Sequence, residues 1–148
     1  TMIEQFALQL RTLETYFNSL QHQQLEITQC EVNYTNHLVI DEGDFSRMTD
    51  FLKVVKFDVE PEDIALRYRR VIENEAKSKV ARLYCEAQPA LKPNKQLIIS
   101  LALTVRGAPS ESTIDSALAF MHKGRDIIVD EFTTITTDKA HKSWQRTR

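Results

Sequence analysis

Four residues, Arg106, Gly107, Ser110 and Ser112, have the types and spacing that suggest the most definite chemistry in this sequence. Arg106 ends an alternating apolar stretch and Gly107 permits an unusual turn after it. The two serines precede a run of helical spacing. The first turn of a helix has free backbone amides and the positive end of the helix dipole, which together favour an anion. The segment Arg106–Thr113 is therefore a candidate binding site for a small anionic ligand.

A capped helix entrance explains the same residues without a ligand. Ser112 and Asp115 have the spacing of a capping-box variant. Arg106 would then pair with Glu31 or Glu86 on the sheet. Phosphate-binding loops also carry more glycine than this segment does. Both interpretations stay open at the level of the sequence.

His122, Asp126 and Asp130 are spaced four residues apart, so they share one face of a helix. An imidazole and two carboxylates in this arrangement are a weak candidate for a divalent metal site. A solvated outer helix face also explains them, and no partner ligands at matching spacing occur elsewhere in the chain. We therefore predict no metal site and no cofactor.

The remaining histidines and the two cysteines offer no catalytic arrangement. Cys30, Cys85, His37 and His141 lack the paired short spacings of a zinc site, which we reject. The cysteines lie among apolar neighbours and are expected to be buried free thiols of a reducing compartment. His141 shares a helix face with Trp144, and we expect ring packing there, with the imidazole bonded to a backbone carbonyl. No catalytic residue is assigned.

The composition is that of an ordinary globular protein. The 148 residues fit one domain, and 42% hydrophobic and 27% charged residues are usual values for a soluble chain. A formal net charge of −2 argues against a dedicated binder of nucleic acid or anionic membranes. No apolar run approaches the ~20 residues that span a bilayer, and no signal-peptide pattern begins the chain. We expect a cytoplasmic protein.

The elements that position these residues begin with Gln96–Arg106, where apolar side chains alternate with polar ones as in a central strand with one buried face. Two further strands are predicted at Ile64–Ile72 and Ala81–Ala87, and a turn at Pro89–Lys95. Short connections make these three strands an antiparallel meander. The stretch Leu25–Ile40 predicts another strand.

Within that stretch the apolar residues move from odd to even positions, which predicts a bulge near Thr28-Gln29. Helical spacing of apolar residues predicts a helix over Ile3–Leu20, a short one within residues 45–55, a long one over Ile114–Ile135 and a last one around His141. Gly124 inside the long helix suggests close approach of another backbone or ring. The expected fold is α+β with two layers. A roughly four-stranded, mainly antiparallel sheet has the N-terminal helix and the long C-terminal helix packed on one face.

The other face of this sheet is predicted to be polar and uncovered. Its residues, with Arg106 at the end of the central strand, are Glu31, Asn33, Asn36, Arg67, Arg69, Arg82, Tyr84 and Glu86. Arginines and a tyrosine can bind single-stranded nucleic acid, but the interleaved glutamates and the negative net charge oppose that interpretation. Burial against another protein portion or a second copy explains the mixed charge more simply.

Five blocks of the sequence together resemble a known family. They are QCEVNYTNHL at Gln29–Leu38, YCEAQP at Tyr84–Pro89, LALTVRGAP at Leu101–Pro109, GRDIIVDEF at Gly124–Phe132 and HKSW at His141–Trp144. Their order and spacing are similar to those in the C-terminal portion of a sporadically distributed, uncharacterised prokaryotic protein family.

The resemblance covers nearly the whole chain and implies that these 148 residues are either the C-terminal portion of a longer architecture or a shortened member of the family. It carries no activity, substrate or cofactor. It implies that certain residues occupy signature positions of the family: Glu31, Tyr34, Asn36, Arg106, Gly107, Gly124, His141 and Trp144.

These observations favour a non-enzymatic interaction or regulatory module that uses the polar outer face of its sheet. The expected partner is another protein or a second copy of the chain. The alternative is a ligand-binding protein or enzyme with an anion site at Arg106–Thr113. A deep pocket enclosing Arg106, Glu31 and Asn36 would favour the alternative, whereas a flat sheet of mixed charge favours the interaction module.

Overall fold

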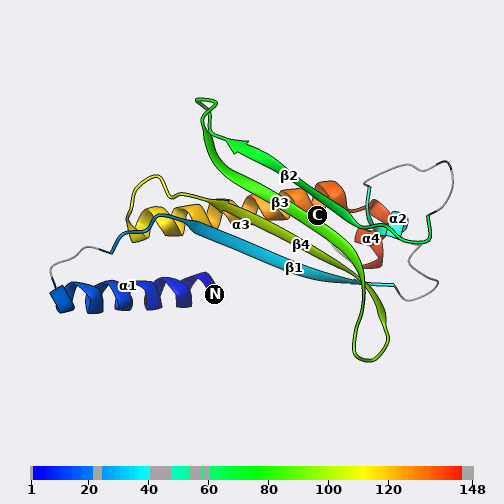
Figure 1. Ribbon diagram of the computed structural model, residues 1–148, viewed down its shortest axis with the longest axis horizontal. Helices are drawn as coiled ribbons and strands as arrows, with labels where there is room; N and C mark the ends of the chain where they lie inside the picture. Colours follow the sequence, from blue (N-terminus) through cyan, green and yellow to red (C-terminus); the bar gives the residue numbers. More distant parts are fainter. Residues whose placement is uncertain (1, 22–24, 41–47, 54–57, 59–60, 145–148) are drawn as a thin grey trace.

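The computed structural model describes residues 2–21, 25–40, 48–53, 58 and 61–144 of the chain (Figure 1). The helices and strands follow in the order α1 (Met2–Gln21), β1 (Cys30–Val39), α2 (Met48–Phe51), β2 (Leu66–Glu73), β3 (Lys79–Leu91), β4 (Leu97–Gly107), α3 (Ile114–Ile135) and α4 (Asp138–Ser143).

The four strands form one antiparallel sheet in the order β1-β4-β3-β2. The predicted meander of β2, β3 and β4 and the central position of β4 are both confirmed. Each hairpin turn contains a lysine with positive φ, Lys77 at 60° and Lys95 at 62°. Backbone hydrogen bonds of 3.0 Å close the two turns, from Asn74 N to the Ser78 carbonyl and from Lys92 N to the Gln96 carbonyl.

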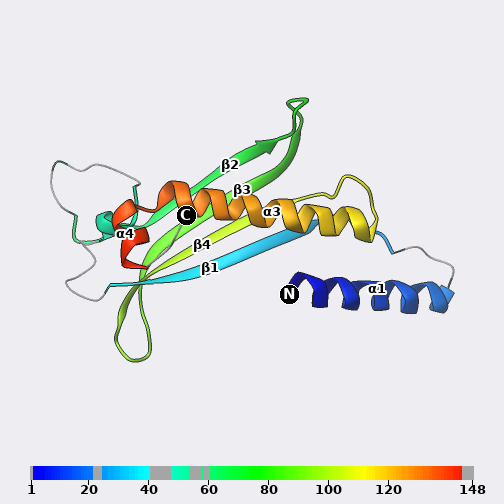
Figure 2. The same cartoon turned by 180° about the vertical axis from the view of Figure 1, so that it is seen from behind.

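Helix α3 lies across one face of the sheet, and strand alternation decides which face it covers (Figure 2). Ile99, Leu101 and Leu103 of β4 point toward α3 and have no exposed surface. Burial of each such side chain contributes about 1.5–3 kcal/mol. The fold is therefore α+β, as predicted, with a four-stranded antiparallel sheet, an N-terminal helix and a long C-terminal helix.

Gly124 lets α3 approach the sheet closely. A Cβ atom at this position would lie 3.0 Å from Cγ2 of Val32 on β1 and 3.6 Å from Cγ1 of Val105 on β4. The predicted close approach is confirmed, although the neighbours are side chains rather than a backbone or a ring.

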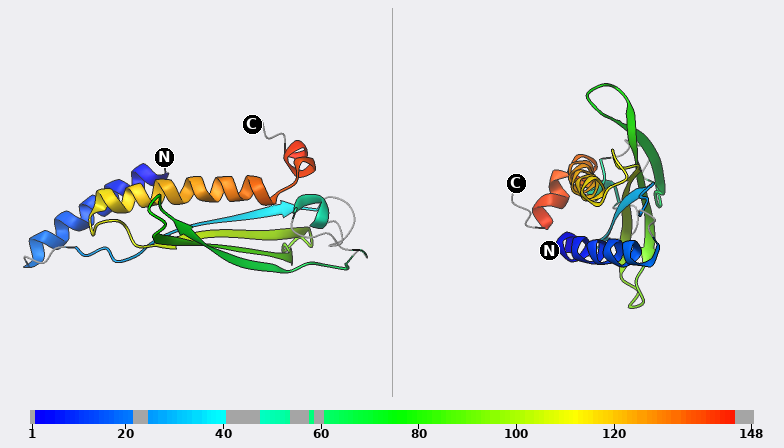
Figure 3. Two further views of the ribbon diagram at one scale, coloured as in Figure 1. Left: turned by 90° about the horizontal axis from the view of Figure 1, so that it is seen from above. Right: turned by 90° about the vertical axis from the view of Figure 1, so that its left-hand side faces the viewer.

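Helix α1 packs mainly beside α3 and not on the sheet, contrary to the expectation that both helices cover the strands. It projects beyond the end of the sheet, as two views show (Figures 1 and 3). Arg11 Nη2 donates to Asp115 Oδ1 at 2.6 Å and links the two helices. An amphipathic pattern indicates that one side of a helix is covered, but not which element covers it. Among the described helices, none is long and apolar enough to cross a membrane.

Strand β1 begins at Cys30 and pairs with β4 without a register shift. The bulge predicted near Thr28-Gln29 is therefore wrong. Residues 25–29 lie before the strand, and the backbone amide of Ile27 donates instead to Ser112 Oγ at 2.6 Å. The point at which the apolar residues move from odd to even positions is thus the start of the strand.

Strand β3 is longer than predicted, because it continues to Leu91 through Pro89. Pro89 pairs with Ile99 on β4, while the ladder to β2 has already ended at Leu66 and Ala87. The missing amide hydrogen of proline therefore costs no hydrogen bond to β2. The turn predicted at Pro89–Lys95 begins later.

The predicted short helix within residues 45–55 is α2, and residues 45–47 and 54–55 lie outside the described ranges. Thr137 joins this segment to the C-terminal helices. Its amide donates to the Phe51 carbonyl at 2.9 Å, its hydroxyl donates to the Asp50 carbonyl, and the hydroxyl also caps α4 by accepting from Ala140 N at 3.1 Å. The ring of Trp144 packs nearby, with its centroid 6.2 Å from that of Phe51.

Candidate functional site

The predicted anion site at Arg106–Thr113 does not assemble around its arginine. Arg106 extends on the outer face of the sheet, opposite to the α3 face. Its Nε donates to Glu31 Oε2 at 2.5 Å, and its guanidinium carbon lies 5.6 Å from the centroid of the Tyr84 ring. The alternative pairing with Glu31 is the observed one.

The residues after Arg106 serve the helix entrance. Thr113, rather than Ser112, is the N-cap of α3, and its Oγ1 accepts from Ser116 N at 3.2 Å. The capping box predicted at Ser112 and Asp115 was therefore wrong by one residue. Ser112 Oγ instead accepts a hydrogen bond from the backbone amide of Ile27, before β1. The hydroxyls of Ser110 and Ser116 are hydrogen bonded at 2.7 Å.

Gly107 ends β4 in extended conformation and does not form an unusual turn. Its lack of a side chain is required by the neighbouring strand. A Cβ atom there would collide with the carbonyl oxygen of Val80 and would lie 3.0 Å from Cα of Ala81.

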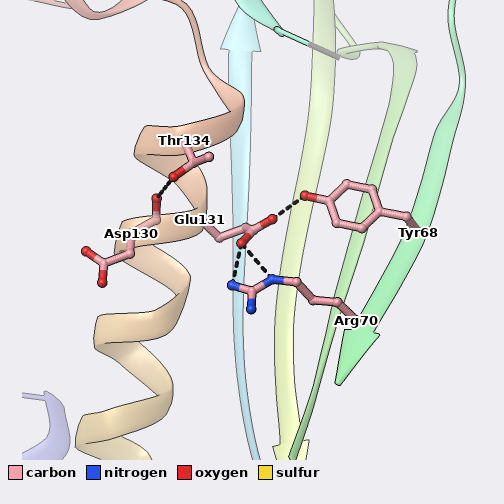
Figure 4. Close-up of polar contacts among 5 residues, drawn as sticks. All are labelled: Tyr68, Arg70, Asp130, Glu131 and Thr134. Atoms are coloured by element: carbon pink, nitrogen blue, oxygen red, sulfur yellow. Dashed lines mark hydrogen bonds and ion pairs between the residues drawn. The ribbon is translucent and has the colours of Figure 1, made fainter. Parts of the chain in front are cut away.

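The weak metal candidate His122, Asp126 and Asp130 lies on the exposed side of α3. Asp126 makes an ion pair with Arg125 at 3.4 Å, and Asp130 points away from the sheet (Figure 4). No group of three or more potential metal ligands occurs among the residues that the structure describes.

His141 is buried, and its imidazole is hydrogen bonded to a threonine hydroxyl. Its Nε2 lies 2.6 Å from Thr136 Oγ1. The Thr136 hydroxyl hydrogen is donated to the Phe132 carbonyl, so Nε2 of His141 is the donor to Thr136. The Trp144 ring lies 6.1 Å from the imidazole and 5.7 Å from the Phe132 ring, in agreement with the expected ring packing. Both cysteines are free and buried, as predicted.

The outer face of the sheet carries nearly all of the residues predicted for it, and in the described part of the chain no helix covers it (Figure 3). Arg67 pairs with Glu86 at 2.9 Å, and Asn33 Nδ2 donates to Thr104 Oγ1. Arg69 and Arg82 make no ion pair with a described residue.

Asn36 was placed on the outer face wrongly. It stands opposite Leu101 of β4, whose side chain is fully buried on the α3 face. Asn36 is an even-numbered residue of β1, like the buried Val32 and Leu38, so strand alternation alone places it on the α3 face. No single pocket therefore collects Arg106, Glu31 and Asn36.

The sequence prediction missed a polar cluster between α3 and the edge strand β2 (Figure 4). Glu131 of α3, only 8% exposed, accepts from three donors. Its Oε1 accepts from the Tyr68 hydroxyl, and its Oε2 accepts from Arg70 Nε at 3.0 Å and Nη2 at 2.7 Å. Two violations of apolar patterning signal this cluster: Arg70 on the inner face of β2, and Glu131 between Ile128 and Ile135 on the inner seam of α3.

The protonation states favoured in this cluster suit a structural link. Burial, together with the bond to Glu131, raises the pKa of Tyr68 far above its ordinary value. Cys85 stands opposite Tyr68 on β3, and burial raises the pKa of its thiol from 9.0 to about 11. Both shifts favour the protonated phenol and thiol at neutral pH, and the phenol donates its hydrogen bond to Glu131. The cluster ties α3 to β2.

A comparison of the chain with protein-family models, curated proteins and solved structures finds no match. The resemblance to the prokaryotic family stays an expectation from the five sequence blocks.

Proposed function

We propose that this chain is a protein-interaction module that pairs with a second copy of itself through α1. The observation that carries the proposal is a stripe of large apolar side chains exposed along this helix. The five side chains of the stripe are between 41% and 72% exposed, and they are Met2, Phe6, Leu13, Tyr16 and Leu20. Contiguous exposed apolar surface of this kind is typical of a contact site.

The stripe has the regular spacing that a partner helix requires. Phe6, Leu13 and Leu20 repeat every seven residues, and Tyr16 lies between the last two at a step of three and then four. This is the spacing of a helix–helix seam. At 1.5 Å per residue the helix is about 30 Å long, which is sufficient for an extended contact. The side of α1 next to this stripe faces α3.

The stripe is also compatible with an identical copy. The charged residues of α1, Glu4, Arg11 and Glu14, lie on the other side of the helix by their spacing, and Arg11 is paired with Asp115. A two-fold interface brings the same patch of both copies together, so like charges within it would repel. An uncharged stripe meets no such penalty.

The outer face of the sheet is less suited to be the primary contact. Two of its arginines already pair with glutamates of the same face, and burying paired charges is costly. It has no apolar centre comparable to the α1 stripe. We therefore assign it a secondary role, in which Arg69 and Arg82 are available to an acidic protein surface.

Light scattering coupled to size exclusion tests this assignment on a matched pair of variants. Leu13→Glu places a charge in the stripe, whereas Leu8→Glu makes the same change at a 69% exposed position off the stripe. We expect the unmodified chain and Leu8→Glu to dimerise and Leu13→Glu to be monomeric, with association weakened by more than about tenfold.

Circular dichroism must show that all of these proteins are folded. A monomeric unmodified chain, or an equal effect of the two substitutions, would refute pairing through α1. Loss of the dimer in Arg82→Glu but not in Leu13→Glu would place the contact on the outer sheet face instead.

A further inference from the structure

We infer that a groove between α3 and the β2–β3 hairpin binds a small amphipathic anion, such as a medium-chain carboxylate. The groove has a volume of about 490 Å³, within the range of roughly 300–1,000 Å³ that is usual for small-molecule sites. It lies at the end of the sheet where the hairpin and the first half of α3 diverge (Figure 2). It is separate from the α1 stripe. It borders the outer sheet face, where Lys79 and Ala108 also line a smaller hollow beside Arg82 and Arg106.

The interior of the groove is apolar. Val105 and Ile72 come from the sheet, while Phe120 and Ile127 come from α3. Gly124 belongs to the same wall, at the point where α3 lies close to Val32 and Val105 of the sheet. A hydrocarbon or ring that enters this groove removes apolar surface from water on both partners, at roughly 25 cal/mol per Å².

The polar groups of the groove are all neutral or positive. Lys79 stands on the β3 side and Lys123 on the α3 side. Ser110 lies in the loop that follows β4, and its hydroxyl is bonded to that of Ser116 in the first turn of α3. Neither lysine makes an ion pair with a described residue, and none of the described residues that line the groove is acidic. An apolar cavity with two available ammonium groups and no carboxylate complements a ligand with an apolar body and one anionic head.

This site differs from the anion site that the sequence suggested. It retains Ser110 but replaces Arg106, which is engaged by Glu31 on the other face, with two lysines. The backbone amides at the start of α3 play no part in it.

Titration calorimetry with three probes that share a ten-carbon chain tests the inference. The two ionic probes are used below their micellar concentrations, and the neutral probe is used below its solubility limit. The probes are decanoate, decanol and decyltrimethylammonium, which carry negative, neutral and positive heads. We expect saturable binding of decanoate, weaker binding of decanol and the weakest binding of the cation. Equal binding of the three probes, or no saturable binding of decanoate, would overturn the inference.

Variants locate the site. Lys79→Ala and Lys123→Ala should each weaken decanoate binding by about three- to fivefold, since the lysines are exposed, and should leave decanol unchanged. Ala119→Trp adds a large ring at an exposed position on the wall of the groove and should abolish binding of both. His122→Trp adds the same ring at an exposed position of α3 outside the groove and is the matched control. Equal effects of the two tryptophan variants would place the ligand elsewhere.

Discussion

Removing the exposed partner of the Arg70–Glu131 pair should destabilise the fold more than neutralising the buried one. Arg70→Met keeps an apolar stem but removes the guanidinium, and it leaves the Glu131 carboxylate, whose side chain is 9% exposed, with only the Tyr68 hydroxyl. In Glu131→Gln the Arg70 side chain, already 48% exposed, can turn into water. The two changes break the same ion pair from opposite sides.

The expected losses in the free energy of unfolding depend on which group is left without its partner. Removing one partner from a fully buried ion pair lowers the free energy of unfolding by about 3–5 kcal/mol. Because Glu131 keeps the Tyr68 hydroxyl as a donor, we expect a loss of about 2–3 kcal/mol for Arg70→Met. Glu131→Gln keeps an amide oxygen near Tyr68 and leaves no unpaired charge in the interior. Its expected cost is about 1 kcal/mol, the usual value for a partly exposed ion pair and its hydrogen bonds.

Urea unfolding followed by the fluorescence of Trp144, the one tryptophan of the chain, measures both free energies. Arg67→Met is the matched control, because Arg67 lies on the same strand and its pair with Glu86 is exposed on the outer face. That control should change the free energy of unfolding by less than about 0.5 kcal/mol. A larger loss in Glu131→Gln than in Arg70→Met, or an equal loss in Arg67→Met, would refute the reasoning.

Three further outcomes are expected. Burial raises the pKa of Cys85 from 9.0 to about 11 in the folded chain, so its contribution to stability is complete below pH 9 and is lost as the pH rises toward 11. Over this pH range the urea midpoint should therefore fall less in Cys85→Ala than in the unmodified chain. Gly107→Ala forces a methyl group against the Val80 carbonyl and should lower the free energy of unfolding by about 1–3 kcal/mol. Thr137→Ala removes both the α4 cap and the bond to the Asp50 carbonyl and should lower the melting temperature, whereas Thr137→Ser should restore most of it.

The sheet was predictable because strand alternation is a local property. Apolar residues at every second position of β4 gave its buried face, and the alternate positions, which end in Arg106, gave the outer face on which Arg82 and Tyr84 lie. The same alternation, followed along β1, also places Asn36 on the α3 face, opposite Leu101. The continuation of β3 through Pro89 depended on where β2 stops, and no local pattern in β3 contains that information.

The partners of apolar or charged side chains could not be predicted in this way. Arg70 and Glu131 are 61 positions apart, and each alone is only an exception on an apolar face. The two exceptions become a pair once the second half of α3 is known to lie within side-chain reach of β2. For α1 the seam indicates a covered side, but α3 covers only part of it, and this depends on how the helices are arranged around the sheet.

Helix α3 contacts all three features discussed above: the Glu131 cluster, the groove and helix α1 with its apolar stripe. Its second half is fixed to the edge strand by Glu131, and its middle is fixed to β1 by the contact between Gly124 and Val32. Its first half diverges from the β2–β3 hairpin, which opens the groove on one side, while α1 packs along its other flank (Figures 1 and 2). The groove and the α1 stripe therefore lie at the same end of the molecule, away from the cluster that stabilises α3. Loss of the Glu131 cluster should lower stability without removing either surface, whereas substitutions in the groove or the stripe should affect binding while the fold persists.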